Sequence, residues 1–138
     1  MQRRDFQDLA NRRLREAQLL YNNRLYSGAY YLAGYAIECA LKACICKKTR
    51  KGDFPRDRKA LENIFTHDLE KLIKGAELTV LHQTYMQADQ AFAVNWATVK
   101  DWSEETRYQV HTQKKARDFL QAINDPTSGI IAWLRNYW

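Results

Sequence analysis

The most constraining feature of this sequence is a run from residue 28 to residue 43 that carries almost no polar side chain. It reads Gly28-Ala29-Tyr30-Tyr31-Leu32-Ala33-Gly34-Tyr35-Ala36-Ile37-Glu38-Cys39-Ala40-Leu41-Lys42-Ala43. Apolar residues surround nearly the whole cylinder of a helix built from this run, so the helix must be covered by other elements. Its frequent small residues let neighbouring backbones come close. We therefore expect a central, buried helix over about 27–47.

The rest of the chain also has helical periodicity. Apolar residues at 6, 10, 14, 17 and 21 form one stripe of a helix over about 4–22. Similar patterns predict a short helix from about 66 to 75, a longer one over about 77–97, another over about 110–124 and a last one from Ser128. Only 5 Gly and 2 Pro argue against an all-β sandwich. With 138 residues, we expect one all-α domain, 1–138.

Several polar residues have the character of helix caps. Ser27 is a candidate N-cap for the central helix, Thr66 for the short helix, and Ser103 for the helix over about 110–124. Asp68 and Glu70 would lie in the first turn of the short helix, where the helix dipole favours negative charge.

The charge of the chain is concentrated in one stretch. The net charge is +6, and residues 47–59 contain seven basic and two acidic side chains. A moderately basic protein permits a polyanionic partner without requiring one. The stretch could contact nucleic-acid phosphates, but it has a single aromatic residue, Phe54, for stacking on bases. The alternative is a solvated loop.

Motifs of the common enzyme classes and of metal sites are absent from the sequence. It contains no P-loop, no GxGxxG, no HExxH and no G-x-S-x-G. Cys39, Cys44 and Cys46 lie in one predicted helix at spacings that bring no pair together, and no second pair completes a zinc set. We expect reduced, mostly buried thiols, no metal and no cofactor. The lack of a long apolar run or an apolar leader predicts a cytoplasmic protein with no membrane contact.

Arg107 and His111 are the candidate catalytic pair. They are four residues apart, so on a helix they would share a face. Such a pair could cleave RNA without a metal, with His111 as general acid and base and Arg107 stabilising the phosphorane charge. The alternative is a solvent-facing pair in a polar stretch.

Glu38 and His67 are further candidates. Glu38 lies in the middle of the apolar run, and a buried carboxylate needs a partner. That partner is either Lys42, one helical turn away, or Arg107 through a tertiary contact. His67 precedes a predicted helix, where it would serve in capping or packing or, alternatively, as a ligand.

Three segments resemble those of HEPN domains. The apolar run Ala29–Ala43 resembles their second helix. His67-Asp68-Leu69-Glu70-Lys71-Leu72 resembles the H-D-L-x-x-L start of their third helix. Trp102-Ser103-Glu104-Glu105-Thr106-Arg107-Tyr108 is similar to the W-S-x-E-x-R-Y segment of one prokaryotic branch. The three segments follow in the family's order, so the resemblance covers nearly the whole chain.

The resemblance implies an antiparallel bundle of four to five helices, commonly a homodimer. It also implies RNA or nucleotide binding, or a metal-independent endoribonuclease of a toxin–antitoxin-type system. Catalytic members carry R-x(4–6)-H, whose two residues from each subunit meet at the dimer cleft. Three residues separate Arg107 from His111 here, which departs from that spacing.

The leading expectation is therefore a cytoplasmic, dimeric, HEPN-like protein that binds RNA or a nucleotide. Arg107 would contact phosphate, His111 would act as general acid and base, and Glu38 would hold Arg107 in place. We also expect Tyr108 and His67 to position a substrate. The alternative is a non-enzymatic interaction module that partners a minimal nucleotidyltransferase.

Overall fold

A computed structural model describes residues 1–49 and 62–138 of the chain. The all-α prediction is confirmed, since the described residues contain helices and no strand. The elements are α1 (Arg3–Asn22), α2 (Tyr26–Lys48), α4 (Leu69–Gly75), α5 (Thr79–Ala88), α6 (Gln90–Val99), the 3-10 helix η1 (Glu104–Tyr108), α7 (Gln113–Asn124) and α8 (Ile130–Leu134).

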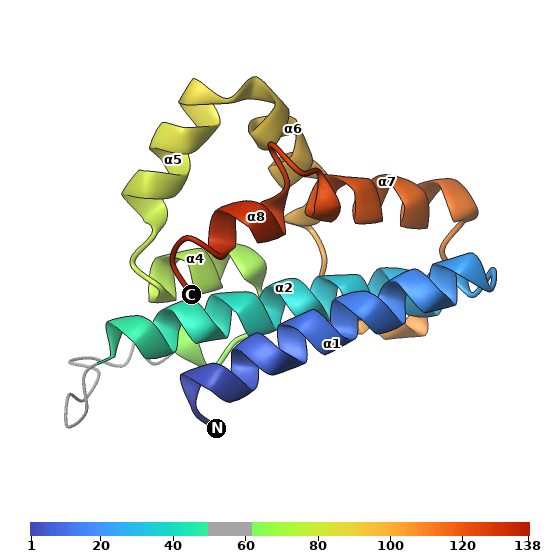
Figure 1. The fold of residues 1–138 in the computed structure, drawn as a ribbon, viewed down its shortest axis with the longest axis horizontal. Helices are drawn as coiled ribbons and strands as arrows, with labels where there is room; N and C mark the ends of the chain where they lie inside the picture. Colours follow the sequence, from blue (N-terminus) through green and yellow to red (C-terminus); the bar gives the residue numbers. More distant parts are fainter. Residues whose placement is uncertain (50–61) are drawn as a thin grey trace.

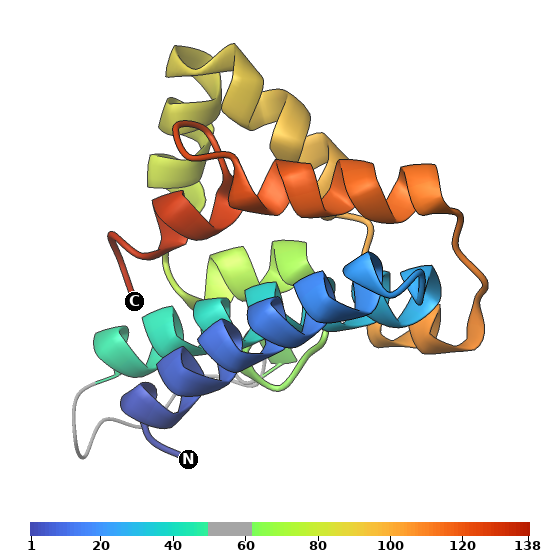
Figure 2. The ribbon, with the colours of Figure 1, turned by 45° about the vertical axis from the view of Figure 1, so that its right-hand side comes forward.

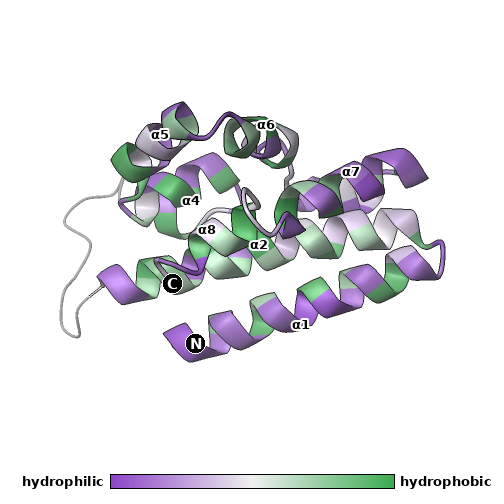
Figure 3. Ribbon diagram, turned by 45° about the horizontal axis from the view of Figure 1, so that its top comes forward, coloured by the Kyte–Doolittle hydropathy of each residue, from purple (hydrophilic) through white to green (hydrophobic). Residues whose placement is uncertain are grey.

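The two longest helices, α1 and α2, form an antiparallel pair that runs the length of the molecule (Figure 1). α1 buries one stripe, Ala10, Leu14 and Ala17, against α2. α2 is buried over most of its length and all round, as its sequence predicts. In Figure 3, α1 is accordingly mostly hydrophilic, whereas α2 is pale to hydrophobic.

The remaining helices cover the other side of α2. α4, α7 and α8 pack on α2, and α6 packs on α7 (Figure 2). α5 and α6 form a bent pair that projects away from the α1–α2 pair. The core is one continuous cluster of buried apolar side chains drawn from all of these α-helices except α5. None of the described helices has the length and apolarity that a membrane crossing requires.

The single helix expected over 77–97 is two helices, because Asp89 interrupts it. Asp89 has an extended backbone, φ −130° and ψ 99°, and its carboxylate accepts the Phe92 N–H at 3.0 Å as the N-cap of α6. The Ser128 hydroxyl donates to the other carboxylate oxygen at 2.8 Å. A capping aspartate in a helical pattern therefore marks a break that apolar periodicity passes over.

Three predicted caps also fall elsewhere. Asp68, rather than Thr66, caps α4 by accepting the Lys71 N–H at 3.1 Å. Thr112, rather than Ser103, caps α7, while Ser103 precedes η1. Ser27 lies within α2, and its hydroxyl accepts a hydrogen bond from residue 111 instead.

The basic stretch 47–59 falls mostly outside the described residues. Lys47 and Lys48 form the last turn of α2, and the prediction for the rest of the stretch lies beyond the part of the chain that the structure describes.

Candidate functional site

The segment 102–111 carries the predicted catalytic pair and is fixed to α2 by Trp102. Trp102 is 1% exposed, and its indole lies on Gly34. A Cβ atom at Gly34 would come within 2.2 Å of the indole, so only glycine permits this approach. η1, which follows Trp102, also packs on α2. The chain is thus held tightly just before Arg107.

Arg107 ends up exposed at the far end of η1. Its Nη2 donates to the Tyr108 hydroxyl at 2.8 Å, and its guanidinium carbon lies 4.8 Å from the centre of the Tyr108 ring. The hydrogen bond to Tyr108 is the main reason why the pKa of Arg107 is raised, with weaker help from Tyr31 and Glu104. No ion pair to Arg107 occurs in the described part of the chain. The guanidinium is available to an anion from outside.

His111 points the opposite way, into the protein. It is 6% exposed, and its ring stacks on Tyr30 with centroids 4.1 Å apart. Its backbone N–H donates to the Ser27 hydroxyl at 2.8 Å, and its Nε2 lies 3.4 Å from the Thr106 carbonyl. Burial, together with Lys115, lowers the pKa of His111, so the ring is neutral near pH 7.

The expected shared helix face of Arg107 and His111 does not exist. η1 ends at Tyr108, and Gln109 has an extended backbone, so the two side chains diverge, one to solvent and one to the core. The solvent-facing alternative fits Arg107 alone. The spacing of Arg107 and His111 could not predict this divergence, because a separation of four places two residues on one face only in an α-helix.

Glu38 is a buried carboxylate, 1% exposed, in the middle of α2. Its Oε1 accepts from Lys42 Nζ at 3.1 Å, which confirms the nearer of the two predicted partners. The same oxygen also contacts His67 Nδ1. The predicted contact from Glu38 to Arg107 does not form. No described residue hydrogen-bonds to Glu38 Oε2.

His67 bridges two elements. Its Nδ1 contacts Glu38 on α2, and its Nε2 lies 3.2 Å from Glu104 Oε2 at the start of η1. Capping at this position falls to Asp68. We call Glu38, Lys42, His67 and Glu104 the carboxylate cluster. Glu104 was not among the predicted site residues, because its partner is distant in sequence.

A cavity of about 410 Å³ adjoins the carboxylate cluster. Its lining is mostly acidic and polar and comes from the chain around the start of α4, from the chain before η1 and from the first two residues of η1: Thr66, His67, Asp68, Glu70, Lys100, Asp101, Trp102, Ser103, Glu104 and Glu105. An acidic lining disfavours phosphate, so an anion would be drawn to the Arg107 end of η1 instead.

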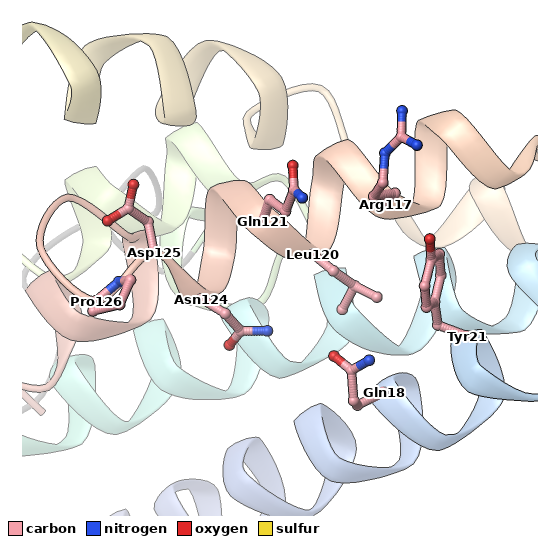
Figure 4. A pocket seen from close by; sticks show the side chains of 8 residues that line it. All are labelled: Gln18, Tyr21, Arg117, Leu120, Gln121, Asn124, Asp125 and Pro126. Carbon is pink, nitrogen blue, oxygen red and sulfur yellow. The ribbon is translucent and has the colours of Figure 1, made fainter.

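A larger cavity of about 630 Å³ lies between α1 and α7, away from the predicted site residues (Figure 4). Side-chain amides, Tyr21 and Arg117 line it: Gln18, Tyr21, Arg117, Leu120, Gln121, Asn124, Asp125 and Pro126. The Nε of Arg117 lies 3.6 Å from Asp118 Oδ1, so this guanidinium, unlike that of Arg107, is already paired.

The described residues contain no group of three His, Cys, Asp or Glu side chains that could hold a metal ion. Cys39 and Cys44 are buried, Cys46 is partly buried, and all three are free thiols. Burial raises the pKa of Cys39 to about 11 and that of Cys44 to about 12, so neither is a reactive thiolate.

Comparison with family models identifies the chain. The model of the HEPN domain matches residues 4–137, nearly the whole length. This protein belongs to the HEPN domain family. No curated protein and no solved structure gives a significant match. The resemblance of the three sequence segments to HEPN motifs is thereby confirmed at the level of the family.

The fold brings those three HEPN segments together. α2 supplies Glu38, the chain entering α4 supplies His67, and η1 supplies Glu104, and the three side chains are in contact. The motifs that suggested the family therefore meet at one place, next to the segment that presents Arg107.

Proposed function

We propose that this HEPN protein binds RNA or a nucleotide through the exposed pair Arg107 and Tyr108. The supporting observation is the guanidinium of Arg107, which has no ion-pair partner among residues 1–49 and 62–138 and is held over an aromatic ring that is 77% exposed. A guanidinium binds phosphate oxygens through two parallel hydrogen bonds, and an exposed tyrosine ring stacks on a base. The pair thus offers both contacts that a nucleotide needs.

The proposal is binding rather than cleavage. General acid–base chemistry requires the imidazole to reach the scissile phosphate directly or through one water. The ring of His111 is instead buried against Tyr30. Endoribonuclease activity in a toxin–antitoxin-type system, the finer expectation from the resemblance, would need that ring to leave its site.

The first experiment measures the affinity of the purified protein for a short single-stranded RNA of mixed sequence and for a free nucleotide. Arg107→Ala should weaken RNA binding about tenfold, since a charge-assisted contact of this kind is worth roughly 1.5 kcal/mol. The log–log salt slope should shrink by about 0.7 for each phosphate that the variant no longer neutralises. Arg117→Ala is the matched control, because that arginine is exposed but paired with Asp118, and it should change little.

Two results would contradict the proposal. One is an Arg107→Ala variant that binds RNA as tightly as the wild type does. The other is cleavage of the RNA, in the presence of a chelator, that His111→Ala abolishes, which would restore the endoribonuclease assignment.

A non-enzymatic interaction module is the second candidate, favoured by apolar side chains at the same end of the molecule. Val110 is 94% exposed, and Leu25 and Tyr108 are also exposed. The hydrogen bond from His111 to Ser27 brings their two segments together. Such a surface suits a second copy of the chain, or the minimal nucleotidyltransferase that the resemblance implies as partner.

A variant separates this candidate from RNA binding. Val110→Asp should disrupt a dimer in sedimentation experiments if the apolar side chains form its interface. An interaction module without RNA affinity would be dimeric or partner-bound and would show no salt-dependent RNA binding. Salt-dependent RNA binding together with an unchanged oligomeric state of Val110→Asp would dismiss the module.

A further inference from the structure

The bridge made by His67 has a chemical requirement that its neighbours reveal. Both ring nitrogens face carboxylate oxygens, Nδ1 that of Glu38 and Nε2 that of Glu104. A carboxylate only accepts hydrogen bonds, and a neutral imidazole donates through only one of its nitrogens. Both contacts are therefore hydrogen bonds only when His67 is an imidazolium.

The two carboxylates belong to elements that are far apart in the chain. Glu38 is fixed in the buried middle of α2, while Glu104 is the first residue of η1 and 42% exposed in its side chain. The His67 ring therefore joins a rigid element to a short surface helix. A helix of five residues has little stability of its own and depends on such tertiary contacts.

Arg107 lies in the same short helix, three residues after Glu104. Trp102 fixes the chain before η1, and His111 fixes it beyond. Between these two anchors, the Glu104–His67 contact is the only ion pair or side-chain hydrogen bond from η1 to the segment before α4 among the described residues. A change at His67 is therefore felt by the helix that presents the guanidinium.

We propose that His67 is a positioning residue, whose ring ties η1 to α2 through its contacts with Glu104 and Glu38 and so sets the position of Arg107 for anion binding. The inference rests on the proposed function and adds a positioning residue to it. When either contact of the bridge is removed, η1 loosens and RNA affinity falls.

Other charged groups face His67, and the test must separate its role from theirs. They come from α2, the start of α4, the chain before η1 and η1 itself: Glu38, Lys42, Asp68, Glu70, Lys100, Asp101, Glu104 and Glu105. Glu105 is the most useful of these, because it lines the same cavity but makes no ion pair with His67 in the described structure.

The experiment compares the RNA affinity of the wild type with that of variants on either side of the bridge. His67→Gln and Glu104→Gln should each weaken RNA binding about threefold, the value of one half-exposed charged hydrogen bond. The double variant should bind no more weakly than either single variant, because both substitutions break the same bridge. Glu105→Gln, the matched control, should bind RNA like the wild type.

A second readout needs no RNA. Hydrogen exchange of the backbone amides of η1, expressed as protection factors, should be lower in His67→Gln and in Glu104→Gln than in the wild type, and no lower in the double variant. A merely structural role for His67 would lower protection throughout α2 and α4 as well.

The results separate the two proposals. If Arg107→Ala leaves RNA binding unchanged, the proposed function fails, and the protection factors still test the link between His67 and η1. If Glu104→Gln binds RNA as tightly as the wild type does, or if protection of η1 does not respond to His67→Gln, the positioning role is overturned.

Discussion

Two histidines of this HEPN protein lie in opposite surroundings. His82, in α5, is 5% exposed and meets the edges or faces of Phe92, Trp96 and Trp133, with ring centroids 4.6 to 5.8 Å away. We call these four residues the aromatic cluster. His67 lies half-exposed between two carboxylates. The same type of side chain thus lies once among aromatic rings and once between carboxyl groups.

The difference separates what stabilises the fold from what a site requires. Burial lowers the pKa of His82 to about 4, so its ring is neutral and contributes packing, and its Nε2 has no hydrogen-bond partner among the described residues. The carboxylate cluster instead buries the carboxyl group of Glu38 and, within the described part of the chain, leaves one of its oxygens without a hydrogen bond. A buried ion pair adds little to the stability of a fold, because removing its charges from water costs about as much free energy as their attraction returns. We infer that the aromatic cluster stabilises the domain and that the carboxylate cluster is kept for binding.

The largest expected effect comes from Gly34→Ala, which disturbs the carboxylate cluster indirectly, by displacing Trp102 and the segment that carries Glu104. The new Cβ would lie 2.2 Å from the Trp102 indole, so Trp102 and the following segment must move. We expect a loss of about 3 kcal/mol in the free energy of unfolding, the upper end for overpacking. RNA affinity should fall as well, because Glu104 and Arg107 follow Trp102.

Gly28→Ala is the control for that substitution. It lies in the same helix, and its new Cβ would meet only the flexible end of Leu20, at 3.2 Å. Chemical denaturation should therefore show no loss for Gly28→Ala, and up to about 1 kcal/mol of gain from helix propensity. Equal losses for the two variants would dismiss the close approach of Trp102.

Acid should destabilise the aromatic cluster. The unfolded chain protonates His82 as the pH falls through 6.5, but the folded protein does so only at about 4. Stability is therefore complete above 6.5 and declines toward 4, by roughly 3 kcal/mol for this residue. His111, whose pKa is lowered too, adds to the decline in the same direction.

Denaturation of His82→Leu between those pH values measures the contribution of His82. The variant should match the wild type near pH 7 to within about 1 kcal/mol, because leucine fills the apolar site without an unpaired nitrogen. Its stability should decline less toward pH 4. A decline as steep as that of the wild type would show that His82 is not held neutral.

Asp89→Ala should have a smaller effect, on the bend that brings α5 and α6 together over the aromatic cluster. It removes the cap of α6 and the hydrogen bond to Ser128, which together are worth about 1–2 kcal/mol. Thermal unfolding should show that loss without a change in RNA affinity. Asp68→Ala, which removes the cap of α4 beside the carboxylate cluster, should cost about 1 kcal/mol and also weaken RNA binding.

Glu38→Met should have the smallest effect on stability. It is also the variant that best distinguishes the role of the carboxylate cluster from that of the aromatic cluster. Methionine has a similar volume and removes a buried charge, while Lys42 and His67 are exposed enough to be solvated. We expect the free energy of unfolding to stay within about 1 kcal/mol of the wild type, or to rise. RNA affinity should fall, and a stability loss above about 3 kcal/mol would contradict the assignment.

The sequence predicts the helices well because the apolar residues that a helix buries recur in the sequence with the period of the helix. The stripe of α1 and the uninterrupted apolar run of α2 identify the central pair, and their observed ends differ from the expected ones by a residue or so. The apolar pattern does not predict the bend at Asp89, since the bend depends on a capping hydrogen bond and on Ser128, which is 39 residues away.

The candidate site was predictable only in part, for a related reason. Glu38 and Lys42 are one helical turn apart, so their contact follows from local geometry. The contacts of His67 with Glu38 and Glu104 join three segments and exist only in the folded chain. His111 turns inward because Tyr30 and Ser27 receive it, and neither is close in sequence.

The most direct test of the central claim is ultraviolet crosslinking of the protein to single-stranded RNA, with the adducts mapped by mass spectrometry of the peptides. We expect adducts in the peptide that contains Arg107 and Tyr108, and their loss in Arg107→Ala. Adducts confined to other peptides, such as those that span the basic stretch 47–59, would show that the RNA binds elsewhere and would contradict the account.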